Sequence, residues 1–244
     1  MTPPKLYVFS GSGLSAESGI STFRGNDGTW SNFDINEVCN IFTWRKNREA
    51  IFNFYASRRQ EYSNASFNAA HAQIATWQKR WGRNRVVLLT QNVDNLLEAA
   101  GAEHVTHLHG NINDLLCTSC GYHWSVGIEH YHSQTPCPKC RSLEDVKPGV
   151  ILFHEEAPEY VHLNAMRQSI RGQDIVLVVG TALHVISSDK MLPTQRWGHP
   201  LTWQVNPKPA EPEYYGRVLA MGACEGIAQL NADIEATMSS STLT

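Results

Sequence analysis

Residues 5–25, KLYVFSGSGLSAESGISTFRG, decide the fold that the sequence predicts. They begin with a short apolar run, residues 6–9, which is typical of a buried strand, and the run breaks at glycines before a helix-compatible segment. In the pattern G-x-G-x-x-G/A, Gly11 permits a tight turn, Gly13 lets the backbone approach a pyrophosphate, and Ala16 fills the third small position. The helix that follows would offer free N–H groups to an anion. We therefore predict a phosphate-binding turn, although glycine turns of this kind also close loops that bind nothing.

The composition narrows the class of protein. With 244 residues, 42% of them hydrophobic, the chain can build one large domain with a smaller lobe. The formal net charge of -3 and the lack of long basic runs argue against nucleic acid or an anionic membrane as the main partner. The N-terminal residues MTPPKLYVFS lack the basic and apolar regions of a secretory signal, and no apolar run is as long as a membrane span. We expect a cytoplasmic protein and, by default, a monomer.

Short apolar runs along the chain predict a parallel sheet. Most of these runs are continuous rather than alternating, as expected when helices cover both faces of the sheet. The predicted fold class is therefore α/β, a Rossmann-like doubly wound sheet of about six strands. The predicted strands are residues 6–9, 85–90, 104–108, 174–180, 201–205 and 216–221.

Two insertions interrupt this pattern and predict a smaller lobe. Residues 26–82 are mixed, aromatic and helix-compatible, and residues 111–150 contain most of the cysteines. The remaining segments, 1–25, 83–110 and 151–244, would form the large Rossmann-like lobe. Ligands are expected between the two lobes, because binding crevices form at the carboxyl ends of parallel strands.

Four cysteines have the spacing of a metal site. Cys117 and Cys120 form one C-x-x-C pair, Cys137 and Cys140 form a second, and sixteen residues separate the pairs. This arrangement is typical of four-thiolate tetrahedral zinc, and two redox dithiols are the alternative. Four sulfurs leave the metal no open position, so we expect one structural Zn²⁺. Cys39 is expected to be an ordinary packed residue.

Polar side chains follow two of the predicted strands. The segment TQNVDN, residues 90–95, comes directly after one strand, and HLHG, residues 107–110, ends the next. Taken singly, each is ambiguous, because Asn-x-Asp is a common turn former and a histidine at a strand end is often structural. Taken together, they converge on one edge of the sheet.

At this point the sequence resembles the sirtuins, the NAD-dependent protein-lysine deacylases, over nearly the whole chain. GSGLSAESGISTFRG resembles the family motif GAGxSxxSGIPxFRG, TQNVDNL resembles TQNxDxL, and HLHG resembles the HG motif. KPGVILFHE is similar to a substrate-strand motif that ends in FGE, VVGTALHV is similar to GTSxxV, and the four cysteines match the zinc module. The order and spacing of the motifs also agree.

The resemblance implies an NAD site with His109 as general base and with Asn92 and Asp94 as further catalytic residues. Gln91 and Asn92 would hold the ribose region, while Val93 and Asp94 would bind the nicotinamide carboxamide. The implied cofactor-binding residues are Gly11, Ser12, Gly13, Ala16, Phe23, Arg24, Gln91, Asn92, Val93, Asp94, Gly180, Thr181, Asn206 and Cys224.

The resemblance also implies the reaction. The acyl oxygen of a modified lysine would attack the anomeric carbon as nicotinamide leaves, and His109 would take a proton from the ribose hydroxyls so that they attack the imidate. The products would be nicotinamide, free lysine and O-acyl-ADP-ribose. The partner is an acylated lysine of a protein or peptide, which would pair by strand addition with residues 150–154 and 180–185. The implied substrate-binding residues are Tyr55, Arg58, Val150, Leu152, Phe153, His154 and Val185.

Tyr55 and Arg58 bear on acyl preference. Their separation of three residues places both on one face of a predicted helix. Arginine can pair with a carboxylate and tyrosine can add a hydrogen bond, and this Tyr-x-x-Arg pair resembles the sirtuin subgroup that removes succinyl and malonyl groups as well as acetyl. The alternative is a solvated helix face with the aromatic ring packed on the core.

Three residues depart from the family pattern. Ser12 replaces an alanine, His154 replaces a glycine where the substrate backbone must approach, and Ala182 replaces a serine whose hydroxyl helps to hold the cofactor. Two other functions stay open. An NAD hydrolase or ADP-ribosyltransferase would use the same cofactor residues with another nucleophile, and a zinc- and nucleotide-binding module would catalyse nothing.

Overall fold

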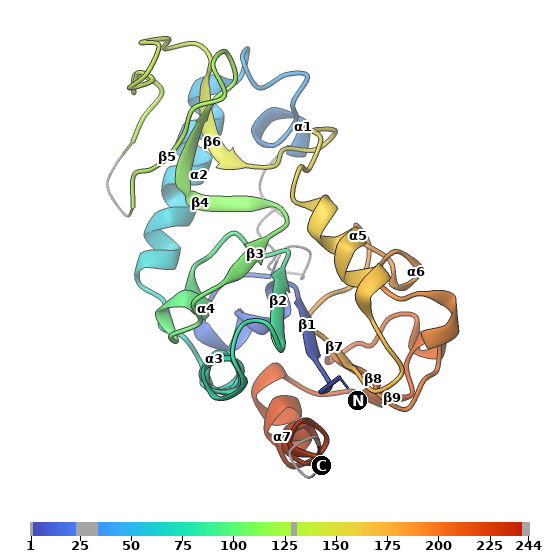
Figure 1. The fold of residues 1–244 in the computed structure, drawn as a ribbon. Helices are drawn as coiled ribbons and strands as arrows, with labels where there is room; N and C mark the ends of the chain where they lie inside the picture. Colours follow the sequence, from blue (N-terminus) through green and yellow to red (C-terminus); the bar gives the residue numbers. More distant parts are fainter. Residues whose placement is uncertain (1, 23–33, 128–130, 241–244) are drawn as a thin grey trace.

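Six parallel strands form the centre of the large lobe in the computed structural model, which describes residues 2–22, 34–127 and 131–240 (Figure 1). Their order is β3-β2-β1-β7-β8-β9, and β1 lies in register between β2 and β7. The predicted doubly wound sheet of about six strands is therefore confirmed. The strands are β1 (Leu6–Ser10), β2 (Val86–Thr90), β3 (Val105–His107), β7 (Ile175–Val179), β8 (Thr202–Val205) and β9 (Arg217–Leu219).

Helices cover both faces of this sheet. Successive side chains of a strand point to opposite faces, and β1 shows this clearly. Leu6 and Val8 pack with α3 and α7, whereas Tyr7 and Phe9 pack with α5 and α6. No helix in the described part of the chain is long and apolar enough to cross a membrane. The helices are α1 (Ile35–Val38), α2 (Arg48–Ser63), α3 (Ala69–Trp81), α4 (Leu96–Ala99), α5 (Tyr160–Ser169), α6 (Ser188–Met191) and α7 (Ala223–Ser239).

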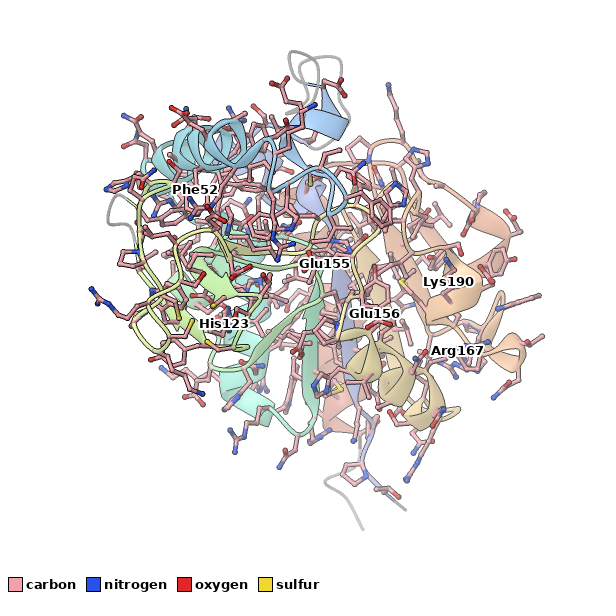
Figure 2. All side chains as sticks on the ribbon, turned by 90° about the horizontal axis from the view of Figure 1, so that it is seen from above. Phe52, His123, Glu155, Glu156, Arg167 and Lys190 are labelled. Carbon is pink, nitrogen blue, oxygen red and sulfur yellow. The ribbon has the colours of Figure 1, made fainter. Side chains whose placement is uncertain are left out.

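The small lobe contains a three-stranded antiparallel sheet and the helices α1 and α2 (Figure 1). Its strands are β4 (Gly110–Cys117), β5 (His123–Ser125) and β6 (Val146–Val150), in the order β5-β4-β6. Phe52 of α2 packs against Leu115 and Tyr131, so the two predicted insertions share one core. Figure 2 places Phe52 and His123 in this lobe and Glu155 near the middle of the molecule.

The helix α3 lies within the predicted insertion 26–82 but packs on the large sheet. Its residues Ala70, Ile74 and Trp77 belong to the core that also holds β1, β2 and α7. On this packing, we propose that the helical part of the small lobe ends before α3.

The helix predicted after the glycine turn is absent. Two 3₁₀ turns, η1 (Ser12–Leu14) and η2 (Ala16–Ser18), take its place, and Gly19 ends them with φ of +83°. The carbonyl that would begin an α-helix, on Leu14, instead accepts a hydrogen bond of 2.8 Å from the Asn68 amide. Ser18 N–H bonds to Ser15 O three residues earlier, as in a 3₁₀ turn.

Replacing Gly13 with alanine should destabilise the fold. An added Cβ would lie 2.7 Å from Gly180 Cα, and backbone atoms cannot turn away as a flexible side chain can. Overpacking of this kind costs about 1–3 kcal/mol. We expect Gly13→Ala to lower the thermal midpoint by several degrees in a calorimetric scan. The matched control is Gly172→Ala, where a Cβ meets nothing within 4 Å, and equal midpoints for the two variants would contradict the prediction.

Candidate active site at the carboxyl edge of the large sheet

The carboxyl ends of neighbouring strands bring the predicted site residues to one edge of the sheet. Gln91 follows β2, Thr181 follows β7, and Asn206 follows β8. The Gln91 side-chain amide donates to Thr181 Oγ1 at 2.9 Å, and the Asn206 amide donates to the Thr181 carbonyl at 2.6 Å. Thr181 thus connects the ends of three strands.

The glycine turn lies directly against the loop after β7. Gly13 N–H donates to Gly180 O at 2.8 Å, and Gly11 N–H donates to Val179 O at 3.0 Å. Gly180 has φ of +65°, and a Cβ there would lie 2.2 Å from Leu14 N. Only glycine permits this approach, which leaves a narrow backbone turn at the strand ends.

Ser15 joins three other side chains in a buried network. Its hydroxyl donates to Asp94 Oδ2 at 2.9 Å and accepts from the Asn92 amide at 3.1 Å. Asn68 N–H donates to Nδ1 of His71, so the His71 proton is on Nε2, which lies 3.3 Å from Ser15 Oγ. Burial lowers the pKa of His71 to about 4, which keeps this ring neutral. The network fixes the Asn92 amide and the Asp94 carboxyl relative to each other.

Our sequence reasoning missed Ser15 and His71. Ser15 is in the quoted glycine-rich stretch, and His71 is the third residue of α3 in a capping box with Asn68. That local pattern could have indicated a helix start. It could not have indicated that the His71 ring faces Ser15, 56 residues earlier.

His109 has the geometry of a base. Its Nδ1–H donates to Gln91 O at 3.1 Å, so Nε2 carries the free lone pair, and the Tyr160 hydroxyl lies 3.0 Å from Nε2. Burial lowers the pKa of His109, and the bond to Gln91 only partly offsets this effect. The ring is therefore neutral near pH 7 and can accept a proton at Nε2.

His107, two residues earlier, has the opposite character. One ring nitrogen lies 2.8 Å from Asn92 O and the other lies 2.8 Å from Glu98 Oε1, and both partners accept hydrogen bonds. Burial lowers the pKa of His107, but the bond and ion pair with Glu98 outweigh it, so the pKa is raised. This ring is a structural cation that holds the Asn92 backbone.

The α2 residues predicted for acyl binding have partners within the small lobe. Tyr55 is buried, and its hydroxyl lies 3.3 Å from Cys39 Sγ. Arg58 forms an ion pair of 2.7 Å with Glu61, whose other oxygen accepts from Ser21 N–H at 3.0 Å. Arg58 Nε is buried and makes no hydrogen bond to any of the described residues, so one donor is still available to a carboxylate.

Most of the backbone predicted for strand addition is already bonded. The buried Lys147 ammonium donates to Val150 O at 2.7 Å and pairs with Glu155 at 3.1 Å. Leu152 N–H donates to the same carboxylate at 2.8 Å, and Phe153 N–H donates to Cys39 O. These contacts hold the segment at the junction of the lobes, where Glu155 appears in Figure 2.

His154 has φ of +67°, a conformation that favours glycine and that explains the glycine expected there by resemblance. Its exposed ring stacks on Phe42 with centroids 5.6 Å apart. Across the described residues, neither backbone group of His154 makes a hydrogen bond. Val185 is 39% exposed.

The remaining predicted residues have varied surroundings. Val93 accepts a backbone hydrogen bond from Ile112 and packs in the small-lobe core. Cys224 is the second residue of α7, and its N–H donates to the Glu17 carboxylate at 3.2 Å. Ser12 and Ala16 lie in the two 3₁₀ turns, and Phe23 and Arg24 lie outside the described residues.

The four predicted metal ligands come together in the small lobe. All four sulfurs lie within 4.8 Å of one another, with Cys117 and Cys140 at 3.5 Å and Cys120 and Cys137 at 3.7 Å. Zn–S bonds of about 2.3 Å in a tetrahedron require sulfurs about 3.8 Å apart. The cluster therefore fits one zinc ion, and its four thiolates leave no position for a substrate.

The fold and the strand-edge site define a doubly wound nucleotide-binding protein with a zinc lobe, and known proteins share this combination. The family model described as Sir2 family matches residues 11–187. The NAD-dependent protein deacylase of Helicobacter hepaticus is 38% identical over 203 residues, which cover 78% of this chain and 79% of the relative. The Campylobacter jejuni protein of the same name is 41% identical over 181 residues, which cover 72% and 76%.

A solved structure of a Sir2 homologue variant with ADP-ribose is also similar. It has a TM-score of 0.81 and 31% identity, and the match covers 99% of this chain and 96% of that one. The chain belongs to the Sir2 family.

Removing one thiolate should release the metal and loosen the small lobe. We expect elemental analysis to show one zinc per unchanged chain and none in Cys137→Ser. The thermal midpoint of this variant should also fall, because structural zinc binding contributes to folding. Cys224→Ser is the control, since Cys224 lies outside the cluster, and it should keep its zinc. Full zinc content in Cys137→Ser would exclude the four-cysteine site.

Proposed function

We propose that this chain uses NAD to remove acyl groups from protein lysines, giving nicotinamide, O-acyl-ADP-ribose and free lysine. The observation that carries the proposal is the His109 imidazole, anchored through Nδ1 to Gln91 O with Nε2 as acceptor, at the same edge as Asn92 and Asp94. The names of the Helicobacter and Campylobacter relatives support it.

The residues at the strand ends suit NAD as a substrate. The glycine turn would lie under the phosphates, and Asn206 beyond β8 would reach the adenosine ribose. Asn92 and Asp94 would contact the ribose and the nicotinamide carboxamide, and Ser15 and His71 would hold them in place. Burial raises the pKa of Asp94, although bonds from Leu96 N–H and Ser15 oppose this effect.

His109 would take the proton of a ribose hydroxyl. A neutral imidazole with its second nitrogen bonded to a carbonyl has one fixed tautomer, so the lone pair on Nε2 is ready to accept. Because burial lowers the pKa of this ring, the base form persists below pH 6.5.

The acyl-lysine peptide would enter between the lobes. The open backbone of His154 and the segment near Val185 are the parts of the predicted strand-addition site that offer hydrogen bonds. Val150, Leu152 and Phe153 would shape the channel through their side chains, because their backbone groups are already bonded.

His109→Ala should reduce deacylation by at least about 100-fold, since general base catalysis contributes roughly 10²–10⁴-fold. Zinc content and thermal midpoint should stay close to those of the unchanged chain. The assay follows release of free lysine from an acetyl-lysine peptide by mass spectrometry. His162→Ala, an exposed α5 residue, is the control, and unchanged turnover in His109→Ala would remove His109 from the mechanism.

The rate should also depend on pH through His109. The ring must be unprotonated to act, and its pKa is lowered in the folded protein, so activity should fall as the pH drops below 6.5 rather than near neutrality. An acid limb centred above pH 6.5 would contradict this assignment.

We propose further that the acyl pocket accepts succinyl and malonyl groups beside acetyl. Within the described part of the chain, the buried Nε–H of Arg58 has no acceptor, and a buried carboxylate would supply one. Tyr55, one turn away on α2, would add a hydrogen bond from its hydroxyl to the acyl carboxylate. The same hydroxyl would keep its contact with Cys39 Sγ.

Arg58→Met should lower kcat/KM for a succinyl-lysine peptide by about 10–100-fold, because a hydrogen bond to a charged group contributes about 1.5–3 kcal/mol. Activity on the matched acetyl peptide should change less than about threefold. Arg80→Met, at an exposed ion pair on α3, serves as the control. Equal losses on both peptides would refute the carboxylate pocket.

Incubation with NAD and matched acetyl, succinyl and unmodified peptides separates deacylation from the alternative use of NAD. Nicotinamide release that requires an acyl peptide supports deacylation. Release without peptide, or ADP-ribose attached to the peptide, would support an NAD hydrolase or an ADP-ribosyltransferase instead.

A further inference from the structure

The Tyr160 hydroxyl is hydrogen-bonded to His109 Nε2, the atom that would accept the proton in the proposed reaction. It lies 3.0 Å from His109 Nε2, and the two rings are tilted by 43° with centroids 6.0 Å apart. Tyr160 is the first residue of α5 and comes 51 residues after His109. The resemblance to known motifs assigned it no role.

The direction of this hydrogen bond is determined by the other side of the imidazole. Nδ1 carries the proton because it faces the Gln91 carbonyl, so Nε2 of the neutral ring can only accept. The tyrosine hydroxyl therefore donates. An imidazole nitrogen has one lone pair in the ring plane, so Nε2 cannot accept from Tyr160 and from a ribose hydroxyl together.

We propose that Tyr160 is a positioning residue that holds the His109 ring in the ligand-free site and gives up its place to a ribose hydroxyl when the substrates bind. The proposal rests on the proposed function of His109 as the base. It adds that Tyr160 caps the base, meaning that its hydroxyl is hydrogen-bonded to His109 Nε2, only while no substrate is bound. Substrate binding would break this hydrogen bond.

The position of Tyr160 in the fold makes such an exchange feasible. Its ring is half-buried and packs at the border of the core that holds Leu163 and Met166, so it is supported without being enclosed. The segment before it includes His154, six residues earlier, whose open backbone is a candidate contact for the peptide. A peptide bound at His154 could therefore shift the first residue of α5, Tyr160, relative to His109.

Few other groups compete for His109. Among the described residues, no charged side chain shifts the pKa of His109, which burial lowers and the bond to the Gln91 carbonyl raises. His107, the last residue of β3, is turned to Glu98 and Asn92. From α5, Tyr160 faces the ring, and burial raises the pKa of its phenol, so it remains a donor across the working pH range.

The test is a titration of the His109 ring by NMR in the free protein, its signal assigned by its absence in His109→Gln. A donated hydrogen bond stabilises the neutral imidazole, so Tyr160→Phe should raise the pKa of His109 by up to about one pH unit. Saturating ADP-ribose, which carries the competing hydroxyls, should abolish the difference between the two proteins. This measurement requires no turnover and stands even if deacylation is not found.

Tyr7→Phe is the matched control. It removes the hydrogen bond of 2.8 Å between the Tyr7 and Ser169 hydroxyls, at the other end of α5, and leaves the His109 contact untouched. An equal shift in Tyr7→Phe, no shift in Tyr160→Phe, or a shift that persists with ADP-ribose would each overturn the proposal.

Steady-state kinetics supply a second readout. In Tyr160→Phe at pH 8, kcat should stay within about twofold of that of the unchanged chain. The KM for NAD should fall by up to about tenfold, because the ribose hydroxyl no longer displaces the Tyr160 hydrogen bond. A large fall in kcat would instead make Tyr160 part of the proton transfer and refute a role confined to the resting state.

Discussion

The contact between the Gly13 and Gly180 backbones is the constraint on which the site depends. These two loops follow neighbouring strands, β1 and β7, and meet at a hydrogen bond of 2.8 Å that side chains would prevent. With the turn held there, Ser15 reaches the residues after β2, on the other flank of β1, and joins Asn92 to Asp94. A single close approach of backbones thus aligns groups from three strands.

Two histidines on one short segment illustrate how partners, rather than position, set charge. Both ring N–H groups of His107 donate hydrogen bonds, one of them to Glu98. The His109 ring donates one hydrogen bond to a carbonyl and accepts one from a hydroxyl. Burial opposes the charged form of each ring, but only His107 has a carboxylate to offset it. The His107 ring therefore supports the backbone, whereas the His109 ring is neutral and its Nε2 accepts a hydrogen bond from Tyr160.

The sequence predicted those features that depend on local pattern. The central strands β1, β2 and β7 are largely continuous apolar runs, and the cysteine spacing alone indicated the four-thiolate cluster. Local sequence pattern did not predict features that involve residues far apart in the sequence. The helix expected after Gly13 is replaced by 3₁₀ turns, and the Leu14 carbonyl there accepts from Asn68, 54 residues later in the sequence. The partners of Ser15 and His109 are likewise remote in sequence. Glu61, only three residues from Arg58, is the exception, since helical spacing could have revealed that pair.

The left-handed backbone of His154 has a consequence for how this position can change over time. A side chain in that conformation costs roughly 1–2 kcal/mol relative to glycine, so random replacement by glycine would make the chain more stable. The imidazole stacked on Phe42 is thus carried against a conformational penalty. His154→Gly would therefore relax the backbone at this position while removing the ring contact with Phe42.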